Sequence, residues 1–199
     1  LIGTASDGMS ALGNTFYGVV ITIGAQGNSV GGVAAGAGNV IANNGLEGVA
    51  LPTFGSPALN NSIRGNSIYN NTGLGINLGS DGVTSNDIND IDSGQNNLQN
   101  FPVITQATVT GVTNTIKGTL NTNISSAAGY AIDFYSNPSC DASGYGEGRT
   151  YLGSVTTSVT DVNGDVVPFV FHPTAGFALG NSITATATDS LGNTSEFSQ

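Results

Sequence analysis

Basic residues are almost absent from this chain of 199 residues, which has three Lys and Arg against 13 Asp and Glu and a formal net charge of −10. A nucleic-acid groove needs clustered basic side chains that replace counterions, and an anionic membrane surface attracts the same groups. The three cations, Arg64, Lys117 and Arg149, are too few and too dispersed in the sequence to form such a cluster. We therefore expect no nucleic-acid partner.

Long apolar runs are also missing. No stretch approaches the roughly 20 apolar residues that a transmembrane helix requires. The first residues do not form a signal peptide, a segment that a secreted protein loses on processing. We expect no direct membrane insertion.

The chain has one cysteine, Cys140, and no tryptophan. A lone cysteine excludes a disulfide within the chain. Two roles remain for this thiol: a partly buried structural side chain, which we expect, or a disulfide to another molecule.

Glycine, in contrast, is abundant, with 30 residues, and Asn, Ser and Thr are frequent. Although only 8% of the residues are charged, 38% are hydrophobic, many of them Val and Ile in short runs. Short aliphatic runs between turn residues are typical of a β-rich globular chain and not of a disordered one.

Two units repeat in the first half of the chain. A Gly-aliphatic-x-aliphatic unit recurs at nearly even spacing, as "GVVI" at 18–21, "GVAL" at 48–51 and "GINL" at 75–78. An Asn-x-aliphatic unit occurs four times, as "NSV" at 28–30, "NVI" at 39–41, "NSI" at 61–63 and "NSI" at 66–68.

These repeats predict very short strands separated by corners, because Gly and Asn tolerate the left-handed backbone that a corner needs. Three strands and three corners close one rung, and stacked rungs place like residues on one another. We therefore predict a parallel β-helix of about three to four rungs over residues 1–100. The Asn residues at matching corners are expected to form ladders whose amides satisfy backbone groups, namely Asn28, Asn39, Asn61 and Asn66.

The pattern changes near residue 101, where segments lengthen and alternate between apolar and polar residues. About seven such segments follow, separated by turn signals such as "DVNGD" at 161–165. Alternating strands over about 100 residues predict an immunoglobulin-like antiparallel β-sandwich over residues 101–199, although the Cys…Trp…Cys core of true immunoglobulin domains is missing.

Several stretches resemble bacterial secreted right-handed parallel β-helix repeat proteins of the adhesin-like kind. In the first half these are "LIGTASDGMSALGN" (1–14), "GVVITIGAQGNSVGG" (18–32), "GAGNVIANN" (36–44) and "GINLGSDGVTSNDINDIDSGQNNLQNFPV" (75–103). "IDFYSNPSCDASGYGEGRTYLGS" (132–154) and "ITATATDSLGNTSEFS" (183–198) are similar to the immunoglobulin-like module that follows such repeats. The resemblance implies an all-β fold and an extracellular or cell-surface location. The same fold is shared with polysaccharide lyases and hydrolases.

The opening "LIGT" is similar to the interior of a rung and not to a cap. We expect either that the chain is the C-terminal piece of a longer β-helix or that an open rung stacks on another molecule. The predicted partners are therefore other protein chains or further copies, which would give fibres, with surface glycans as an additional partner.

Residues suited to catalysis are scarce in the predicted β-helix. A lyase of this fold needs a basic residue beside the substrate, and Arg64 is the only one there, at a position where alternation predicts an outward side chain. A hydrolase needs paired carboxylates, whereas the acids of positions 1–80 are Asp7 and Glu47 alone. We therefore expect a structural or adhesive module and not an enzyme. A carbohydrate-active enzyme, or its glycan-binding part, is the alternative.

One acidic cluster lies between the two predicted domains, in "NDINDIDSG" at 86–94. Calcium binds six to eight oxygen atoms, preferably several carboxylates on a loop. No cofactor is required, but Ca²⁺ is a candidate ligand of Asp87, Asn89, Asp90 and Asp92, with Asp81 upstream. The alternative is a solvated connection with Asx-turns.

Other polar groups have simpler explanations. Asp161, Asn163 and Asp165 fit a hairpin turn. Asp141 and Glu147 are expected to hold Arg149. The row Thr184, Thr186 and Thr188 could order water as ice-binding surfaces do, but a solvent-facing edge strand is the preferred interpretation. Four tyrosines that could stack on sugars are scattered through different loops, at Tyr17, Tyr69, Tyr145 and Tyr151.

Overall fold

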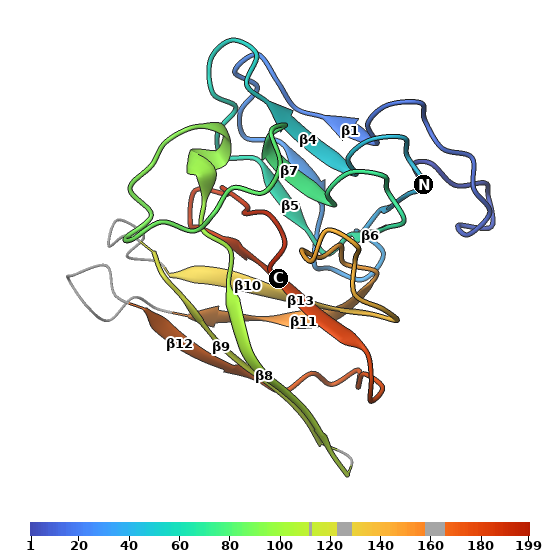
Figure 1. The fold of residues 1–199 in the computed structure, drawn as a ribbon, viewed down its shortest axis with the longest axis vertical. Coiled ribbons are helices and arrows are strands. Elements are labelled where there is room, and N and C mark those ends of the chain that lie inside the picture. The colour runs from blue at the N-terminus through green and yellow to red at the C-terminus, as the bar shows by residue number, and fades with distance from the viewer. Residues whose placement is uncertain (112, 123–128, 158–165) are drawn as a thin grey trace.

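The structure is a computed structural model that describes residues 1–111, 113–122, 129–157 and 166–199 (Figure 1). The described chain is all-β, with short strands, turns and one 3₁₀ segment at Gln95–Leu98. No helix in these residues is long and apolar enough to cross a membrane. The predicted turn at Asp161, Asn163 and Asp165 lies outside the described residues.

The first half of the chain forms three small parallel sheets. The chain visits the sheets in rotation and returns to each one on its next circuit, as the pairs Val49↔Ile76 and Val30↔Ile63 illustrate. The first sheet contains β1 (Val19–Val20), β4 (Val49–Pro52) and β7 (Ile76–Gly79). The other two pair β2 (Ser29–Gly31) with β5 (Ser62–Arg64), and β3 (Val40–Ala42) with β6 (Ser67–Tyr69).

Each circuit of the chain through these sheets is called a layer below. Layer 1 (residues 2–31) holds β1 and β2, and its Ile2 forms a parallel bridge to Ile41 of β3. Layer 2 (residues 40–64) holds β3, β4 and β5, and layer 3 (residues 67–98) holds β6, β7 and the 3₁₀ segment.

Aliphatic side chains from the repeated units fill the space inside the layers. They are almost completely buried and form one cluster that includes Ile41, Leu51, Ile63, Ile68, Ile76 and Leu78. Corners follow the strands where Asn and Gly adopt left-handed backbone, as at Asn43 (φ 61°), Asn70 (φ 57°) and Gly65 (φ 63°). A Cβ atom at Gly65 would lie 2.3 Å from the carbonyl oxygen of Gly32 in the neighbouring layer, so that close stacking also requires glycine there.

The second half contains two antiparallel sheets. One joins β12 (Val167–Phe171), β9 (Thr113–Leu120) and β8 (Val103–Thr110), and the other joins β11 (Thr150–Thr157), β10 (Tyr130–Asn137) and β13 (Ser182–Thr188). Phe134 of β10 stacks on Phe171 of β12 with 4.5 Å between ring centroids and meets Phe169 edge-on. The two sheets therefore share an aromatic core.

The two halves pack directly on each other, with the end of the parallel sheets against β10 and the last residues of the chain (Figure 1). Tyr135 and Phe197 come from the second half, yet they belong to the buried cluster of the first. The apolar core is thus continuous across the boundary between the parallel and antiparallel sheets.

Candidate functional site

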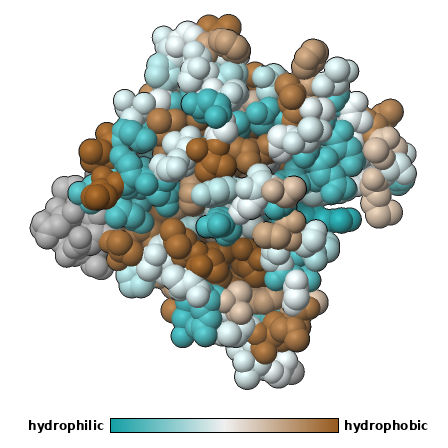
Figure 2. Space-filling model, in the orientation of Figure 1, coloured by the Kyte–Doolittle hydropathy of each residue, from teal (hydrophilic) through white to brown (hydrophobic). Residues whose placement is uncertain are grey.

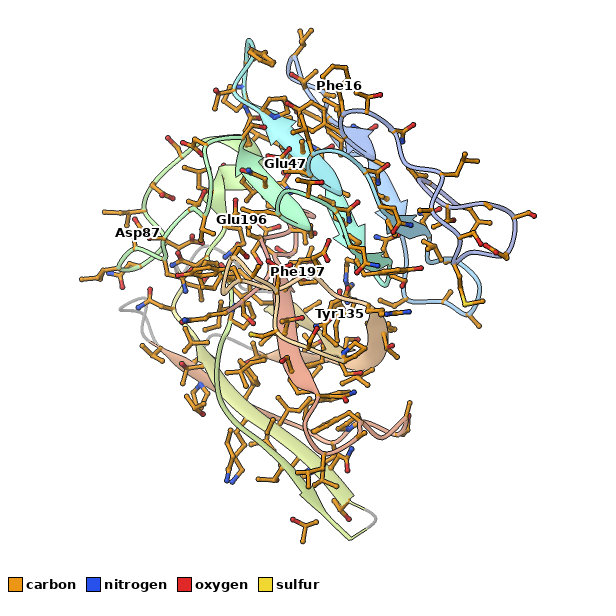
Figure 3. All side chains as sticks on the ribbon, turned by 45° about the vertical axis from the view of Figure 1, so that its right-hand side comes forward. Phe16, Glu47, Asp87, Tyr135, Glu196 and Phe197 are labelled. Atoms are coloured by element: carbon orange, nitrogen blue, oxygen red, sulfur yellow. The ribbon has the colours of Figure 1, made fainter. Side chains whose placement is uncertain are left out.

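The acidic cluster lies in the segment that connects β7 to β8. Oxygen atoms of Asp87, Asp90 and Asp92 lie within 4.8 Å of one another. Asp90 is buried, whereas Asp92 is exposed and Asp87 is half-buried near the surface (Figure 3). The structure therefore brings together three of the four predicted ligands, and Asp81 does not belong to this group among the described residues.

Hydrogen bonds hold the buried member in place. The two carboxylate oxygens of Asp90 accept hydrogen bonds from the Asn100 backbone N–H and from Nε2 of Gln99, each at 2.9 Å. Asn89 donates its backbone N–H to Oδ1 of Asn121 at 2.7 Å. Asn89 and Asp90 both adopt left-handed backbone, with φ of 66° and 51°, which turns the chain sharply within the cluster.

Oδ2 of Asp87 accepts a hydrogen bond from the Ile91 N–H at 3.2 Å, four residues ahead, which differs from the predicted Asx-turn, where the donor lies two residues ahead. The other oxygen of Asp87, Oδ1, is buried and has no hydrogen-bond partner in the described structure. A buried carboxylate oxygen without a donor is costly unless a cation or water satisfies it. This atom favours the cation-binding interpretation.

Electrostatics in the cluster favour uptake of a positive charge. Burial, followed by the charges of Asp87 and Asp92, raises the pKa of Asp90 to about 7, and the hydrogen bonds from Asn100 and Gln99 oppose that rise. Burial and then Asp87 also raise the pKa of Asp92. Three carboxylates at this spacing suit Ca²⁺, with one oxygen ligand from each of Asp87, Asp90 and Asp92.

A second set of carboxylates closes the exposed edge of layer 3. Its basis is an asparagine ladder in which Oδ1 of Asn44 accepts hydrogen bonds from the N–H and Nδ2 of Asn14, and Oδ1 of Asn71 accepts the same pair from Asn44. Beyond Asn71 the next acceptor is Oε1 of Glu147, at 2.9 Å from both the N–H and Nδ2 of Asn71. A glutamate of the second half thus occupies the place of the next asparagine.

Glu196 has the same role on another sheet. Its Oε1 accepts the Leu78 N–H at 2.8 Å and its Oε2 accepts the Thr84 N–H at 2.9 Å. Glu196 is only 2% exposed, and burial is the main cause that raises its pKa to about 7. Burial likewise raises the pKa of Glu147, although hydrogen bonds from Asn70 and Asn71 oppose the shift.

The two predicted ladders are confirmed. Oδ1 of Asn61 accepts the N–H and Nδ2 of Asn28, and Oδ1 of Asn66 accepts those of Asn39. The Nδ2 groups of Asn61 and Asn66 donate to the carbonyls of Ala25 and Val30. Sequence reasoning missed the third ladder, although "IANN" at 41–44 and "IYNN" at 68–71 recur with the same spacing as "GVAL" and "GINL".

The prediction that Arg64 points into solvent is wrong. Its Nε and Nη2 bind the two oxygens of Asp133 at 2.7 and 2.8 Å, and Asp133 is completely buried. The Tyr151 hydroxyl donates to the same carboxylate at 3.2 Å. This pair joins β5 to β10, so that Arg64 finds its carboxylate partner in the second half.

A cleft of about 320 Å³ lies between β6 and the loops of the second half. Arg149 stacks over the ring of Tyr69 at 4.6 Å to the centroid, so the expected contact of Arg149 with Glu147 is replaced by a cation–π contact. Cys140 also lines the cleft and is exposed, which corrects the expectation of a partly buried thiol. Because Arg149 covers one face of the ring and Tyr69 is only 7% exposed, the ring does not offer a free face for stacking on a sugar.

The threonine row is likewise not a solvent-facing surface. Thr184, Thr186 and Thr188 are at most 4% exposed. Residues 194–198 pair with the free edge of this strand, and the loop of Gly146 and Glu147 lies against Thr184. The Thr184 hydroxyl donates to the Glu147 carbonyl at 2.7 Å and helps to position the loop that carries this glutamate.

The acids predicted to be unsuitable for catalysis make structural hydrogen bonds. Asp7 accepts hydrogen bonds from Ser10 and Met9, and Glu47 accepts one from Nδ2 of Asn77. No model of a protein family and no solved structure matches the chain.

Proposed function

We propose that this chain is a structural and adhesive module of an extracellular or cell-surface protein. In this proposal the three layers are rungs of a right-handed parallel β-helix in residues 1–100, and residues 101–199 are an immunoglobulin-like β-sandwich that closes its last rung. The resemblance of the repeats to adhesin-like β-helix proteins supports the location.

The observation that carries the proposal is that the second half satisfies the last strand of all three parallel sheets. The Ile63 N–H of β5 donates to Oγ1 of Thr194 at 3.0 Å, and the Ile68 N–H of β6 donates to the Gly148 carbonyl at 2.8 Å. The Leu78 N–H of β7 donates to Oε1 of Glu196. An uncovered strand edge invites pairing with another chain, and these contacts prevent it.

The same boundary is stiff, which suits a load-bearing part. The bidentate Arg64–Asp133 pair, the Tyr135 hydroxyl that accepts the Gly65 N–H at 3.1 Å, and the buried Phe197 ring tie the halves together. A hinge between domains has few buried contacts, unlike this boundary.

Hydrogen exchange of the intact chain tests whether the second half closes the parallel sheets. We expect the amides of Ile63, Ile68 and Leu78 to exchange as slowly as those of β4. Glu196→Ala should accelerate exchange at Leu78 at least tenfold and leave Ile68 nearly unchanged, whereas the control Asp141→Ala, in a loop where the side chain bonds to Ser143, should change neither. Rapid exchange at all three amides in the wild type, with β4 protected, would contradict the proposed closure.

A separate assay tests the structural role against the carbohydrate-active alternative. The intact chain is incubated with uronate-containing and neutral glycans in the presence of Ca²⁺, and reducing ends are measured. We expect no turnover. Turnover of any glycan would overturn the structural proposal in favour of an enzyme.

A further inference from the structure

We infer that the cleft between β6 and the loop of residues 137–149 is a binding site for a carboxylated sugar, such as the uronate residue of a surface glycan, and that Arg149 binds its carboxylate. The inference deepens the proposed adhesive function, on which it rests, because it names the chemistry of the surface to which the module adheres.

The cleft has the size and the lining of a site for a small polar ligand. Its volume of about 320 Å³ lies near the lower limit of roughly 300 Å³ for ligand-binding clefts. Both halves of the chain form its walls, with β6 and its corner on one side and the loop that follows β10 on the other. Hydrophilic residues gather on the surface around β6 (Figure 2), which suits a hydroxylated ring better than an apolar ligand.

Arg149 is the basic residue of this cleft, and it forms no ion pair with a carboxylate in the described part of the chain. Arg64 differs, because two of its nitrogen atoms already bind the Asp133 carboxylate. Lys117 lies on β9 and does not line the cleft. The guanidinium of Arg149 therefore keeps the planar set of N–H donors that matches a carboxylate bidentately.

Several contacts fix Arg149 in place independently of a ligand. Its backbone N–H donates to Oδ1 of Asn137 at 2.8 Å, and its carbonyl accepts the Ser67 hydroxyl at 2.6 Å. The Tyr69 ring under its guanidinium is held in turn, because the Tyr69 hydroxyl donates to the Gly8 carbonyl at 2.9 Å. A side chain that is already ordered loses little conformational entropy on binding, which favours affinity.

The opposite wall offers groups that suit sugar hydroxyls. Oδ1 of Asp141 accepts hydrogen bonds from the N–H and the hydroxyl of Ser143 at 2.8 and 2.6 Å, which fixes the loop. Asn70, Ser139 and Ser182 also line the cleft, and their side chains both donate and accept hydrogen bonds. One cation thus faces several polar groups, which is the arrangement that a sugar with one carboxylate requires.

A carboxylate fits this environment better than a phosphate. A phosphate monoester carries about 1.5–2 negative charges near neutral pH, whereas a carboxylate carries one. Asp141 lines the cleft and the chain has a net charge of −10, so the second charge of a phosphate is repelled. Glu147 repels a ligand less, because burial raises its pKa and its oxygens accept hydrogen bonds from Asn70 and Asn71.

Titration of the intact chain with glucuronate, followed by the chemical shifts of backbone amides, tests the site. We expect shifts at Ser139, Asp141 and Arg149 that saturate at roughly millimolar ligand, because one charged contact and a few hydrogen bonds give modest affinity. Glucose, which lacks the carboxylate, and inorganic phosphate should each bind about tenfold more weakly or less.

Substitution of the cation tests its role. Arg149→Met keeps an unbranched side chain over Tyr69 but removes the charge and the donors, and should weaken glucuronate binding by about tenfold or more. Arg149→Lys keeps the charge without the planar donors and should weaken binding less. The matched control Lys117→Met removes a cation outside the cleft and should leave the affinity unchanged.

A variant that retains Arg149 gives a second measurement. Ala142→Trp fills the cleft from an exposed lining position and should abolish the shifts, whereas Ala107→Trp, at an exposed position of β8, should preserve them. Absence of shifts with glucuronate, equal affinity for glucose or phosphate, or an affinity that Arg149→Met leaves unchanged would each overturn the inference. Hydrogen exchange at Ile63 and Leu78 in the same samples reports separately on the proposed closure of the parallel sheets.

Discussion

The two outer edges of the parallel sheets differ in what covers them, although the strands at both edges have the same short aliphatic pattern. At the edge that faces the second half, the N–H groups of Ile63 in layer 2 and of Ile68 and Leu78 in layer 3 meet acceptors of the second half, and Phe197 closes the apolar interior. At the layer 1 edge, Val20 and Ile23 remain exposed. A repeated strand pattern gives both outer edges the same capacity to pair with a further strand. Only residues outside the repeat supply the acceptors that block this pairing at one of the two edges.

The largest expected effect comes from breaking the ion pair that joins the covered edge to the second half. Asp133→Ala would leave Arg64 without its partner, and loss of one member of a buried pair typically costs about 3–5 kcal/mol. Because Arg64 is 22% exposed, we expect the lower end, about 3 kcal/mol, in the free energy of unfolding measured by chemical denaturation.

The double variant Arg64→Met with Asp133→Leu is the control. It removes both charges and should recover most of the lost stability. Equal stability of Asp133→Ala and the wild type would show that the pair does not hold the two halves together.

Calcium should stabilise the segment that connects β7 to β8, where the acidic cluster lies. If Ca²⁺ binds only the folded chain at Asp87, Asp90 and Asp92, a hundredfold excess over the Kd stabilises the chain by about 2.7 kcal/mol. We expect a higher melting temperature with Ca²⁺ than with a chelator. Asp92→Asn should reduce the difference, and the control Asp141→Asn should keep it. No shift in the wild type would reject a structural Ca²⁺ at this cluster.

The buried carboxyls at the covered edge predict a dependence on pH. Burial raises the pKa of Glu196 and of Asp90 to about 7, above the values of 4.5 and 3.8 for the free side chains. Between these limits the folded chain binds more protons than the unfolded chain, so its stability should fall as the pH rises from about 5 to 7 and level off above 7. We expect a total decrease of at least about 2 kcal/mol, since one pKa unit corresponds to about 1.4 kcal/mol for each of the two groups.

Denaturation across that pH range tests the assignment. Glu196→Gln should flatten the curve. Asp7→Asn should not, because hydrogen bonds from Ser10 and Met9 lower the pKa of Asp7 to about 2, outside the window. A stability that rises between pH 5 and 7 in the wild type would contradict this account.

The smallest effect is expected at the open edge. Ile23→Asn keeps the left-handed corner with a residue that tolerates it, and should raise the free energy of unfolding by about 0.5–1 kcal/mol. Ile88→Asn is the matched control, because Ile88 has the same exposed fraction of 77% and no left-handed backbone. Destabilisation by Ile23→Asn would show that the isoleucine already packs usefully in the free chain.

Much of the first half was predictable because its signals are local and periodic. The spacing of "GVVI", "GVAL" and "GINL" predicts the pairing of β1, β4 and β7, and the corner asparagines predict the ladders Asn28–Asn61 and Asn39–Asn66. The acidic segment also forms the expected cluster of Asp87, Asp90 and Asp92, because these residues are close neighbours in the sequence.

The wrong predictions share a cause. Arg64 appeared solvent-facing because alternation describes a strand and its own sheet, and Asp133 lies far along the chain on β10. Thr184, Thr186 and Thr188 appeared to face solvent, but they are buried, and residues 194–198, which follow in the chain, pair with the edge of their strand. Cys140 appeared partly buried because lone cysteines usually are, yet it lies at the rim of a cleft between loops.

By itself, the sequence determined the all-β character, the parallel pairing of the repeats and the ladders, because strand period, corner residues and repeat spacing act over short distances. Only the tertiary structure decided which edge of the sheets is closed. That outcome depends on Glu147, Asp133, Thr194 and Glu196, which come from outside the repeats and reach their partners only when two separately patterned halves pack together. The packing of the two halves places these carboxylates against the N–H groups at strand edges and corners, and no local sequence pattern predicts that role.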